Sequence, residues 1–543
     1  MTMLEKYKSE KIAETVYDDQ RSEGPGFELI PARVLPEKRA ALDDFVLVDR
    51  ADRDDVLHVA RVGSGHEINP ESDPQLQQES EAYGLPTDDV RAGDHAPRVT
   101  RVVDLEPVGE LAVVEGDDGD VDDDDADEDK VEMRRPTLLP QTAQSVYALS
   151  ASHLPELLGL PGEEDPPGFW IGTVESGGDK ADFEFSREVI SRHVAILGRT
   201  GVGKTHTAHV LIEELVEQGV PVVSFDVEDD ARPMAEALDG RTVRPDEDLD
   251  IPYSLIGYEG FEKFLSDLTD TQKELVATGY STVHEEAIQQ LEEEGEVDVS
   301  FGALLSEVEN YGDNIGSRAT DAAVSRTGWA LNNTALLGEE MDDWAGLLSE
   351  NSLVNVDIGH LGQRDRALVI GAIARMLKQL RAREEIPPFV LVIDEAHKYI
   401  PSGTSTTAST RIVRDLVQTG RHIGIGAVLA TQSPSSLDQI TLRTCNTHVV
   451  LALDSEEMTS VRGLFGDLSK ETIDRIPKLE KGRAMVASAR DLIRNTIPVD
   501  VRDRWTPEGA PTPDLVADAE AWFEEHGDRN DRDFQGSLDQ SFE

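Results

Sequence analysis

The segment Gly198-Arg199-Thr200-Gly201-Val202-Gly203-Lys204-Thr205 has the residue types and spacing needed to bind a phosphate chain. Its pattern, Gly-x4-Gly-Lys-Thr, is that of a phosphate-binding loop. Glycines allow backbone N–H groups to converge on phosphate oxygens without interference from a Cβ atom. We expect Lys204 to reach the β- and γ-phosphates of ATP and the Thr205 hydroxyl to ligate Mg2+. The residues assigned to nucleotide contacts are Gly198, Thr200, Gly201, Val202, Gly203, Lys204, Thr205 and His206.

The flanking sequence matters, because the same spacing recurs by chance in unrelated proteins. The apolar run HVAILG (193–198) precedes the loop and predicts a strand. Apolar residues at helical spacing follow it, from Val210 to Val216. A helix that begins at the loop would direct its N-terminus at a bound anion. The strand, loop and helix together predict a nucleotide site.

A pair of carboxylates follows a second apolar run, FVLVID (389–394). We expect Asp394 to hold the Mg2+ shell, through water, and Glu395 to orient or deprotonate the attacking water. Alone, such a pair could merely cap the next helix. Together with a phosphate loop in the same sheet, it favours hydrolysis of ATP over simple binding.

Three further polar residues sit at strand ends. Gln432 follows the run GIGAVLAT (424–431) and is placed to sense the γ-phosphate or the water, although alone it would fit a simple strand cap. Arg192 precedes the strand of the phosphate loop, and Arg421 precedes the strand of Gln432. Phosphoryl transfer gains from a guanidinium that a neighbouring subunit often supplies. Both a role at a subunit interface and a structural salt bridge fit the two arginines.

Strands alternate with helices from about residue 168, which predicts an α/β fold with a parallel sheet covered on both faces. The expected fold is a RecA/FtsK-like P-loop ATPase core with a helical insertion, preceded by a small N-terminal β-barrel. The expected strands are 193–198, 220–226, 353–358, 389–394, 424–431 and 448–453. The core is assigned to 168–256 and 348–490, and the helical insertion to 257–347.

Short β-like runs precede the core and predict the barrel over 24–150. FVLVDRADRDDVLHVARVG (45–63) is interpreted as two strands, and RVTRVVDLEPVGELAVV (98–114) as another pair. The remaining assignments are a loose N-terminal arm (1–23), a disordered acidic loop (115–130), a C-terminal strand or brace segment (491–525) and an acidic disordered tail (526–543). A binding site for a basic partner is the alternative for the acidic loop.

The composition is strongly acidic, with 109 Asp and Glu against 51 Lys and Arg and a formal charge of −58. Only 14 of the basic residues are lysines. Acidic chains with few aromatics can be disordered, but here the acids are spread through segments with clear apolar periodicity. The pattern resembles proteins adapted to high salt, which screens such repulsion, and indicates a haloarchaeal source. It argues against a generally basic DNA-coating protein, but a local basic pore remains compatible with it.

Several observations concern the compartment. Cys445 is the only cysteine, so no intrachain disulfide can form. The first twenty residues lack the apolar region of a signal peptide. No run of 18 apolar residues is present, so no membrane span is expected. We therefore expect a cytoplasmic protein.

Four segments in order resemble the HerA-type ATPases of the HerA/FtsK superfamily. They are SRHVAILGRTGVGKTHTA, IDEAHKYIP, TGRHIGIGAVLATQSPSSLD and TLRTCNTHVVLAL. The resemblance runs from about 168 to 515, and the predicted barrel suits the family's N-terminal barrel, which is related to that of ATP synthase subunits.

The resemblance implies a hexameric, ATP-driven motor that translocates on or unwinds double-stranded DNA. In archaea such proteins work with the NurA nuclease in resecting DNA ends for recombination repair. The resemblance also implies that Arg192 and Arg421 act on the ATP of a neighbouring subunit. FDVEDDARP (225–233) departs from the family's usual sequence, so Glu228 is matched only loosely there. The acidic insertion is not a family feature either, which leaves the NurA partnership open.

Two other functions compete with a DNA motor. One is an ATPase of a secretion or conjugation system, although such proteins usually carry membrane segments. The other is a nucleotide-gated scaffold in a defence complex, which would not need the catalytic carboxylate of Glu395.

Overall fold

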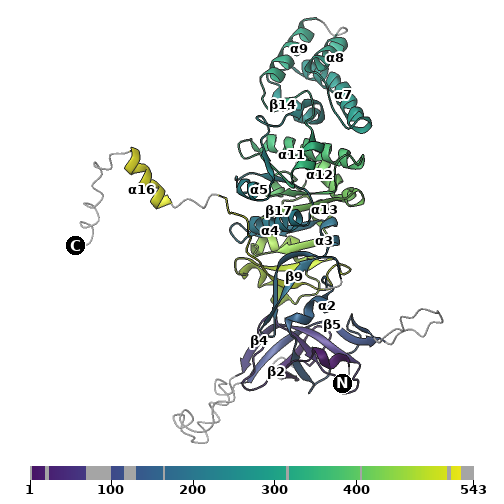
Figure 1. Ribbon diagram of the computed structural model, residues 1–543, viewed down its shortest axis with the longest axis vertical. Coiled ribbons are helices and arrows are strands. Elements are labelled where there is room, and N and C mark those ends of the chain that lie inside the picture. Colours follow the sequence, from purple (N-terminus) through teal and green to yellow (C-terminus); the bar gives the residue numbers. More distant parts are fainter. Residues whose placement is uncertain are drawn as a thin grey trace, which may run out of the picture.

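A computed structural model of the chain describes residues 3–18, 24–68, 100–114, 130–162, 165–312, 317–403, 407–509 and 515–526. Three parts follow one another along the longest axis of the molecule (Figure 1). The barrel lies at one end, the ATPase core in the middle and the helical insertion at the other end. The expected acidic loop and tail fall outside the described residues, apart from residues 130 and 526 at their borders.

The predicted N-terminal barrel is confirmed. Six strands close in the order β2-β1-β7-β3-β4-β5, because β2 also pairs with β5. Alternate residues of β3 enter different apolar cores: Phe45 and Leu47 pack toward the ATPase core, whereas Val46 and Val48 pack inside the barrel. The strands are β1 (Lys11–Thr15), β2 (Ile30–Val34), β3 (Phe45–Val48), β4 (Val56–Ile68), β5 (Thr100–Val114), β6 (Lys130–Arg134, paired with β5) and β7 (Ser145–Ala148).

The structure differs from two expectations for this region. The expected loose arm contains β1, which lies between β2 and β7 because Ile12 and Ala13 are buried. The segment expected to form two strands up to Val114 is the single strand β5. Pro107 and Gly109 flank a bulge opposite β4, a position at which a strand tolerates proline, so the strand continues through them.

The core is a mixed sheet in which the six expected strands are all present. Seven parallel strands run in the order β12-β15-β11-β16-β17-β10-β18, and β19-β20-β8-β9 extend the sheet with antiparallel pairing. The parallel strands are β10 (Val194–Leu197), β11 (Val222–Asp226), β12 (Arg241–Val243), β15 (Leu353–Asp357), β16 (Phe389–Ile393), β17 (Ile425–Thr431) and β18 (Thr447–Val450). The antiparallel strands are β8 (Phe169–Ser176), β9 (Asp179–Phe185), β19 (Arg483–Ser488) and β20 (Ile497–Val501).

Helices cover both faces of the sheet, so β10 is buried on both sides. Its Ala195 and Leu197 join the apolar core that also holds residues of α11 and the insertion, whereas Val194 and Ile196 join the core of α4. The helices around the core are α2 (Leu154–Leu158), α3 (Arg187–Ser191), α4 (Lys204–Glu217), α5 (Arg232–Ala237), α11 (Gln363–Ala382), α12 (Ala408–Thr419), α13 (Gln439–Thr444), α14 (Ser455–Val461) and α15 (Lys470–Ile473). A further helix, α16 (Leu515–His526), follows the core along the chain.

The insertion is built on long helices around an aromatic cluster. The rings of Phe261 and Tyr280 stack with centroids 4.9 Å apart, and Tyr253 packs against both. Its elements are α6 (Tyr258–Phe261), α7 (Asp270–Glu293), α8 (Phe301–Gly312), α9 (Ser317–Asn332) and α10 (Trp344–Glu350), with β13 (Ile251–Pro252) and β14 (Leu337–Gly338) at its base. Within the described ranges, no helix is long and apolar enough to cross a membrane.

A buried charge network joins the end of β20 to α4, the helix that follows the phosphate loop. The Arg502 guanidinium donates to Glu213 at 2.8 Å and to Glu214 at 2.7 Å. Arg502→Ala would leave two carboxylates without their cation, and breaking a buried pair costs about 3–5 kcal/mol. We expect a clearly lower midpoint of thermal unfolding, whereas Arg53→Ala, in an exposed pair with Asp55, changes it little. Equal midpoints for the two variants would contradict this prediction.

Candidate nucleotide site

The phosphate loop joins the end of β10 to the start of α4, and each of three glycines has a physical reason. Gly201 and Gly203 have φ angles of +81° and +113°, which residues other than glycine rarely adopt. At Gly198 a Cβ atom would lie 2.9 Å from Cγ2 of Val202 and 3.1 Å from Cβ of Leu451. The loop therefore presents its backbone closely around the space in front of α4, where a helix N-terminus favours phosphate.

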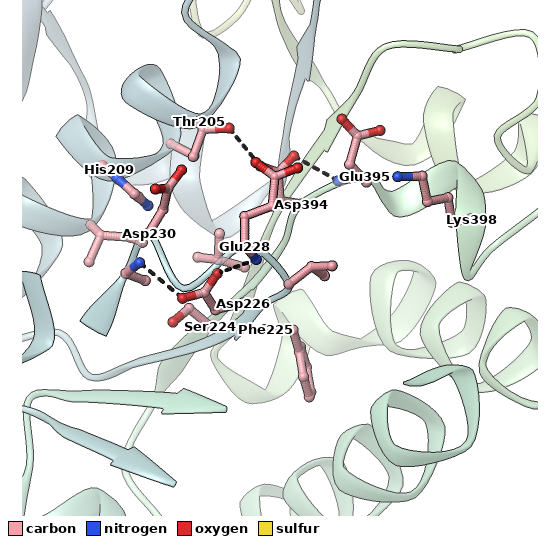
Figure 2. Close-up of a pocket in the computed structure, with 15 residues that line it drawn as sticks. Thr205, His209, Ser224, Phe225, Asp226, Glu228, Asp230, Asp394, Glu395 and Lys398 are labelled. Carbon is pink, nitrogen blue, oxygen red and sulfur yellow. Dashed lines mark hydrogen bonds between the residues drawn. The ribbon is translucent and has the colours of Figure 1, made fainter. Parts of the chain in front are cut away.

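The phosphate loop and the Asp394-Glu395 pair meet through Lys204 and Thr205, the first residues of α4. The Thr205 hydroxyl donates a hydrogen bond of 2.7 Å to Oδ2 of Asp394, which follows β16 (Figure 2). The buried Lys204 ammonium lies 3.8 Å from Oε1 of Glu395. A hydroxyl beside a carboxylate is the hard oxygen donor set that suits Mg2+ shared with substrate phosphates.

Glu395 occupies an environment suited to proton transfer. Its φ of +49° is unusual for a residue with a side chain, and its N–H donates to Oδ1 of Asp394 at 2.7 Å. Burial, and next the charge of Asp394, raise the pKa of the Glu395 carboxyl. The oxygen Oε2 is buried without a hydrogen-bond partner among the described residues. Strained backbone and a raised carboxyl pKa beside a phosphate loop are typical of catalytic residues.

Gln432 lies at the same edge of the sheet, directly after β17. Because β17 is the neighbour of both β10 and β16, its end opens between the phosphate loop and Glu395. Oε1 of Gln432 accepts a 2.5 Å hydrogen bond from the Thr200 hydroxyl of the loop. The structure thus brings Gln432 to the nucleotide-binding residues.

Acidic residues after β11 line a pocket beside Thr205 and Asp394 (Figure 2). Glu228, which the sequence matched only loosely, is one of them. Asp226 accepts backbone hydrogen bonds from Glu228 and Ala231, and burial raises its pKa. Burial, followed by the charges of Asp226 and Glu228, also raises the pKa of Asp230.

Sequence reasoning missed Asp226, Asp230 and the pocket residue Lys398. A run of carboxylates at the end of an apolar strand was the available signal. It became informative only once β11 was known to lie next to β16.

The side chains of His206, Arg192 and Arg421 do not face the phosphate-binding space. Nε2 of His206 is 2.9 Å from the carbonyl oxygen of Arg502, so the ring faces the C-terminal segment. Arg192 pairs with Glu188 and Asp491, each at 2.5 Å. The exposed Arg421 has no carboxylate within 4 Å among the described residues.

Arg192 and Arg421 both precede parallel strands, β10 and β17, whereas the phosphate loop follows one. They therefore lie at the opposite edge of the sheet from the phosphate loop of their own chain. The structure does not bring them to that loop, and their action on a neighbour's ATP stays a prediction.

A strand, a glycine loop and a helix that begins with Lys-Thr, facing an Asp-Glu pair from a nearby strand, define the class of P-loop ATPases. Residues 171–377 match the family model described as "Helicase HerA, central domain". The ATPase core of this chain is therefore of the HerA type, as the resemblance indicated.

Two relatives illustrate the match. The chain is 23% identical over 326 residues to a probable helicase of Methanocaldococcus jannaschii, covering 55% of this chain and 61% of that protein. It is 22% identical over 370 residues to the DNA double-strand break repair helicase HerA of Sulfolobus acidocaldarius, covering 61% and 71%. The first match thus spans about three fifths of its relative.

Among solved structures, VirB4 of Thermoanaerobacter pseudethanolicus aligns with a TM-score of 0.48 and 16% identity. The alignment covers 64% of this chain and 99% of VirB4.

Proposed function

We propose that the chain is an ATP-hydrolysing motor that acts on double-stranded DNA. The observation that carries this proposal is the meeting of Thr205, Asp394 and Glu395 at one edge of the sheet, beside the phosphate loop. This arrangement can hold a nucleotide and also supply a carboxylate to water. Relatives that are named helicases support DNA as the track.

Each residue has a distinct task in the proposed reaction. Lys204 and the loop backbone bind the phosphates, and Thr205 and Asp394 would hold Mg2+. Mg2+ supplies charge neutralisation on the phosphates when bound. Glu395 orients the attacking water and accepts its proton, and Gln432 detects the γ-phosphate.

The assembly is part of the proposal. Arg192 and Arg421 lie across the sheet from their own phosphate loop, so they are available to complete the site of a neighbouring subunit. We infer a ring, with six subunits as in the resemblance, that works in the cytoplasm on DNA ends with a NurA-like nuclease. With a formal charge of −58, contacts to DNA phosphates must be confined to local basic positions.

Linear duplex DNA is expected to raise the rate of ATP hydrolysis several-fold in molar KCl, because a motor couples turnover to its track. The measurement is phosphate release with and without duplex, together with ATP-dependent displacement of a third strand from a DNA triplex. Lys204→Ala removes the phosphate-binding ammonium and is the inactive control.

Equal hydrolysis with and without duplex, and no displacement, would leave an ATPase but remove the DNA motor. No hydrolysis under any condition would remove the proposal altogether.

A further inference from the structure

His397 lies between the end of β17 and the catalytic carboxylate. It belongs to the short turn Ala396–Lys398, and its side chain is largely buried. Nδ1 of His397 is 2.9 Å from the hydroxyl oxygen of Thr431, the last residue of β17. The same nitrogen is 3.4 Å from Oε2 of Glu395. One ring nitrogen therefore faces a hydroxyl from the sensing strand and an oxygen of the catalytic residue.

The oxygen of Glu395 that faces His397 needs a donor. It is the buried Oε2 without a hydrogen bond, and burying a carboxylate oxygen without a partner is unfavourable. Burial, and next the charges of Lys398 and Lys204, lower the pKa of His397, which favours the neutral ring with a single N–H. With its proton on Nδ1, His397 donates to Thr431 at 2.9 Å and has Glu395 as its alternative acceptor.

Thr431 in turn is tied to the sensor of the nucleotide. It is fully buried and directly precedes Gln432, whose side chain is bonded to Thr200 of the phosphate loop. The chain just beyond is anchored. Glu457 accepts hydrogen bonds from the Ser433 hydroxyl and from the hydroxyl and N–H of Ser435, and the Ser433 N–H donates to the Thr431 hydroxyl oxygen at 3.1 Å. With that anchor in place, a displacement of Gln432 by a γ-phosphate acts on its neighbour Thr431.

We propose that His397 is a positioning residue that transmits the state of the Gln432 strand end to Glu395. In the tautomer that carries its proton on Nδ1, this N–H is held by Thr431 in the present arrangement. When bound nucleotide shifts Gln432 and Thr431, the N–H turns to Oε2 of Glu395 and fixes the carboxylate toward the water. The inference rests on the proposed hydrolysis of ATP and adds a residue to that reaction.

Substitution of His397 by asparagine or by glutamine distinguishes donation of a hydrogen bond from the filling of space. The side-chain amide of asparagine reaches the position of Nδ1, whereas that of glutamine reaches the position of Nε2. His397→Asn is therefore expected to keep kcat within a few-fold of wild type. His397→Gln is expected to lower kcat by at least about tenfold with KM unchanged, because only the oriented state of Glu395 is lost.

The partner hydroxyl gives a second, independent variant. Thr431→Ser keeps the hydroxyl and is expected to keep kcat. Thr431→Val removes this competing acceptor at similar volume and is expected to raise kcat, because the N–H of His397 then stays on Glu395. The double variant His397→Gln/Thr431→Val is expected to be as slow as His397→Gln alone, because loss of the Thr431 hydroxyl acts only through the N–H of His397. His153→Gln, in the short turn that follows the barrel, is the control for loss of an imidazole.

Steady-state kinetics of phosphate release and binding of a fluorescent ATP analogue test these expectations on the full chain. Retained analogue binding shows that a slow variant is folded. His397→Asn as slow as His397→Gln, an effect on KM alone, Thr431→Val as slow as His397→Gln, or a double variant faster than His397→Gln would each overturn the role of His397. A wild-type protein that hydrolyses no ATP would instead remove the proposed function itself.

Discussion

Glu395→Gln is expected to lower kcat for ATP hydrolysis by about 10²–10⁴-fold, the range contributed by a general base, while ATP still binds. Glutamine keeps the shape of the side chain but cannot accept the proton of the attacking water. The phosphate-binding residues Lys204 and Thr205 are unchanged, so the affinity for nucleotide is preserved. The measurement is single-turnover phosphate release together with the Kd of a fluorescent ATP analogue.

A matched variant separates this effect from a general loss of acidic charge. Glu236→Gln changes an exposed carboxylate on α5, away from the pocket, and should leave both values at the wild-type level. Wild-type turnover by the Glu395 variant would refute the assignment of the base. Glu228 and Asp230, which line the same pocket, would then be the carboxylates to test.

Much of the site was predictable because its parts are short and local in the sequence. The loop from Gly198 to Thr205 needs only a strand before it and a helix after it. Six of the seven parallel strands were visible as near-continuous apolar runs because both of their faces are buried, whereas the short, partly exposed β12 was not. Asp394, Glu395 and Gln432 could be placed because each directly follows such a run.

The parts that escaped prediction depend on which strands are neighbours. Asp226 and Asp230 join the site because β11 lies next to β16, a fact of sheet order with no local signal. The ion pair of Arg502 with Glu213 joins residues 289 positions apart. In the barrel, the pair of strands expected over 98–114 is the single strand β5 with a bulge, because a bulge and a turn use the same residue types.

The two arginines pose a different question, since no single chain brings them to a phosphate. Arg192 already has carboxylate partners in its own chain, which is the structural alternative for it, whereas Arg421 has none within 4 Å among the described residues. A side chain that completes a neighbour's site should be free of ion pairs in an isolated subunit. Arg421 meets that condition, and Arg192 would have to leave its ion pairs.

Arg192→Ala and Arg421→Ala are each expected to lower ATP hydrolysis by about 10³-fold, as loss of a trans-acting arginine does, with ATP binding retained. Mixing either variant with Lys204→Ala should restore part of the activity. In a mixed ring, some interfaces combine the intact loop of one subunit with the intact arginine of the next.

If the arginines act within their own chain, no mixture can restore activity, because each subunit lacks either the lysine or the arginine. Arg187→Ala, an exposed arginine on α3 near Arg192, is the matched control and should stay active unmixed. Recovery of activity in mixtures with the Arg421 variant but not with the Arg192 variant would give Arg192 a structural role, in its salt bridges with Glu188 and Asp491. The mixing experiment therefore decides separately, for each arginine, whether the nucleotide site is shared between subunits.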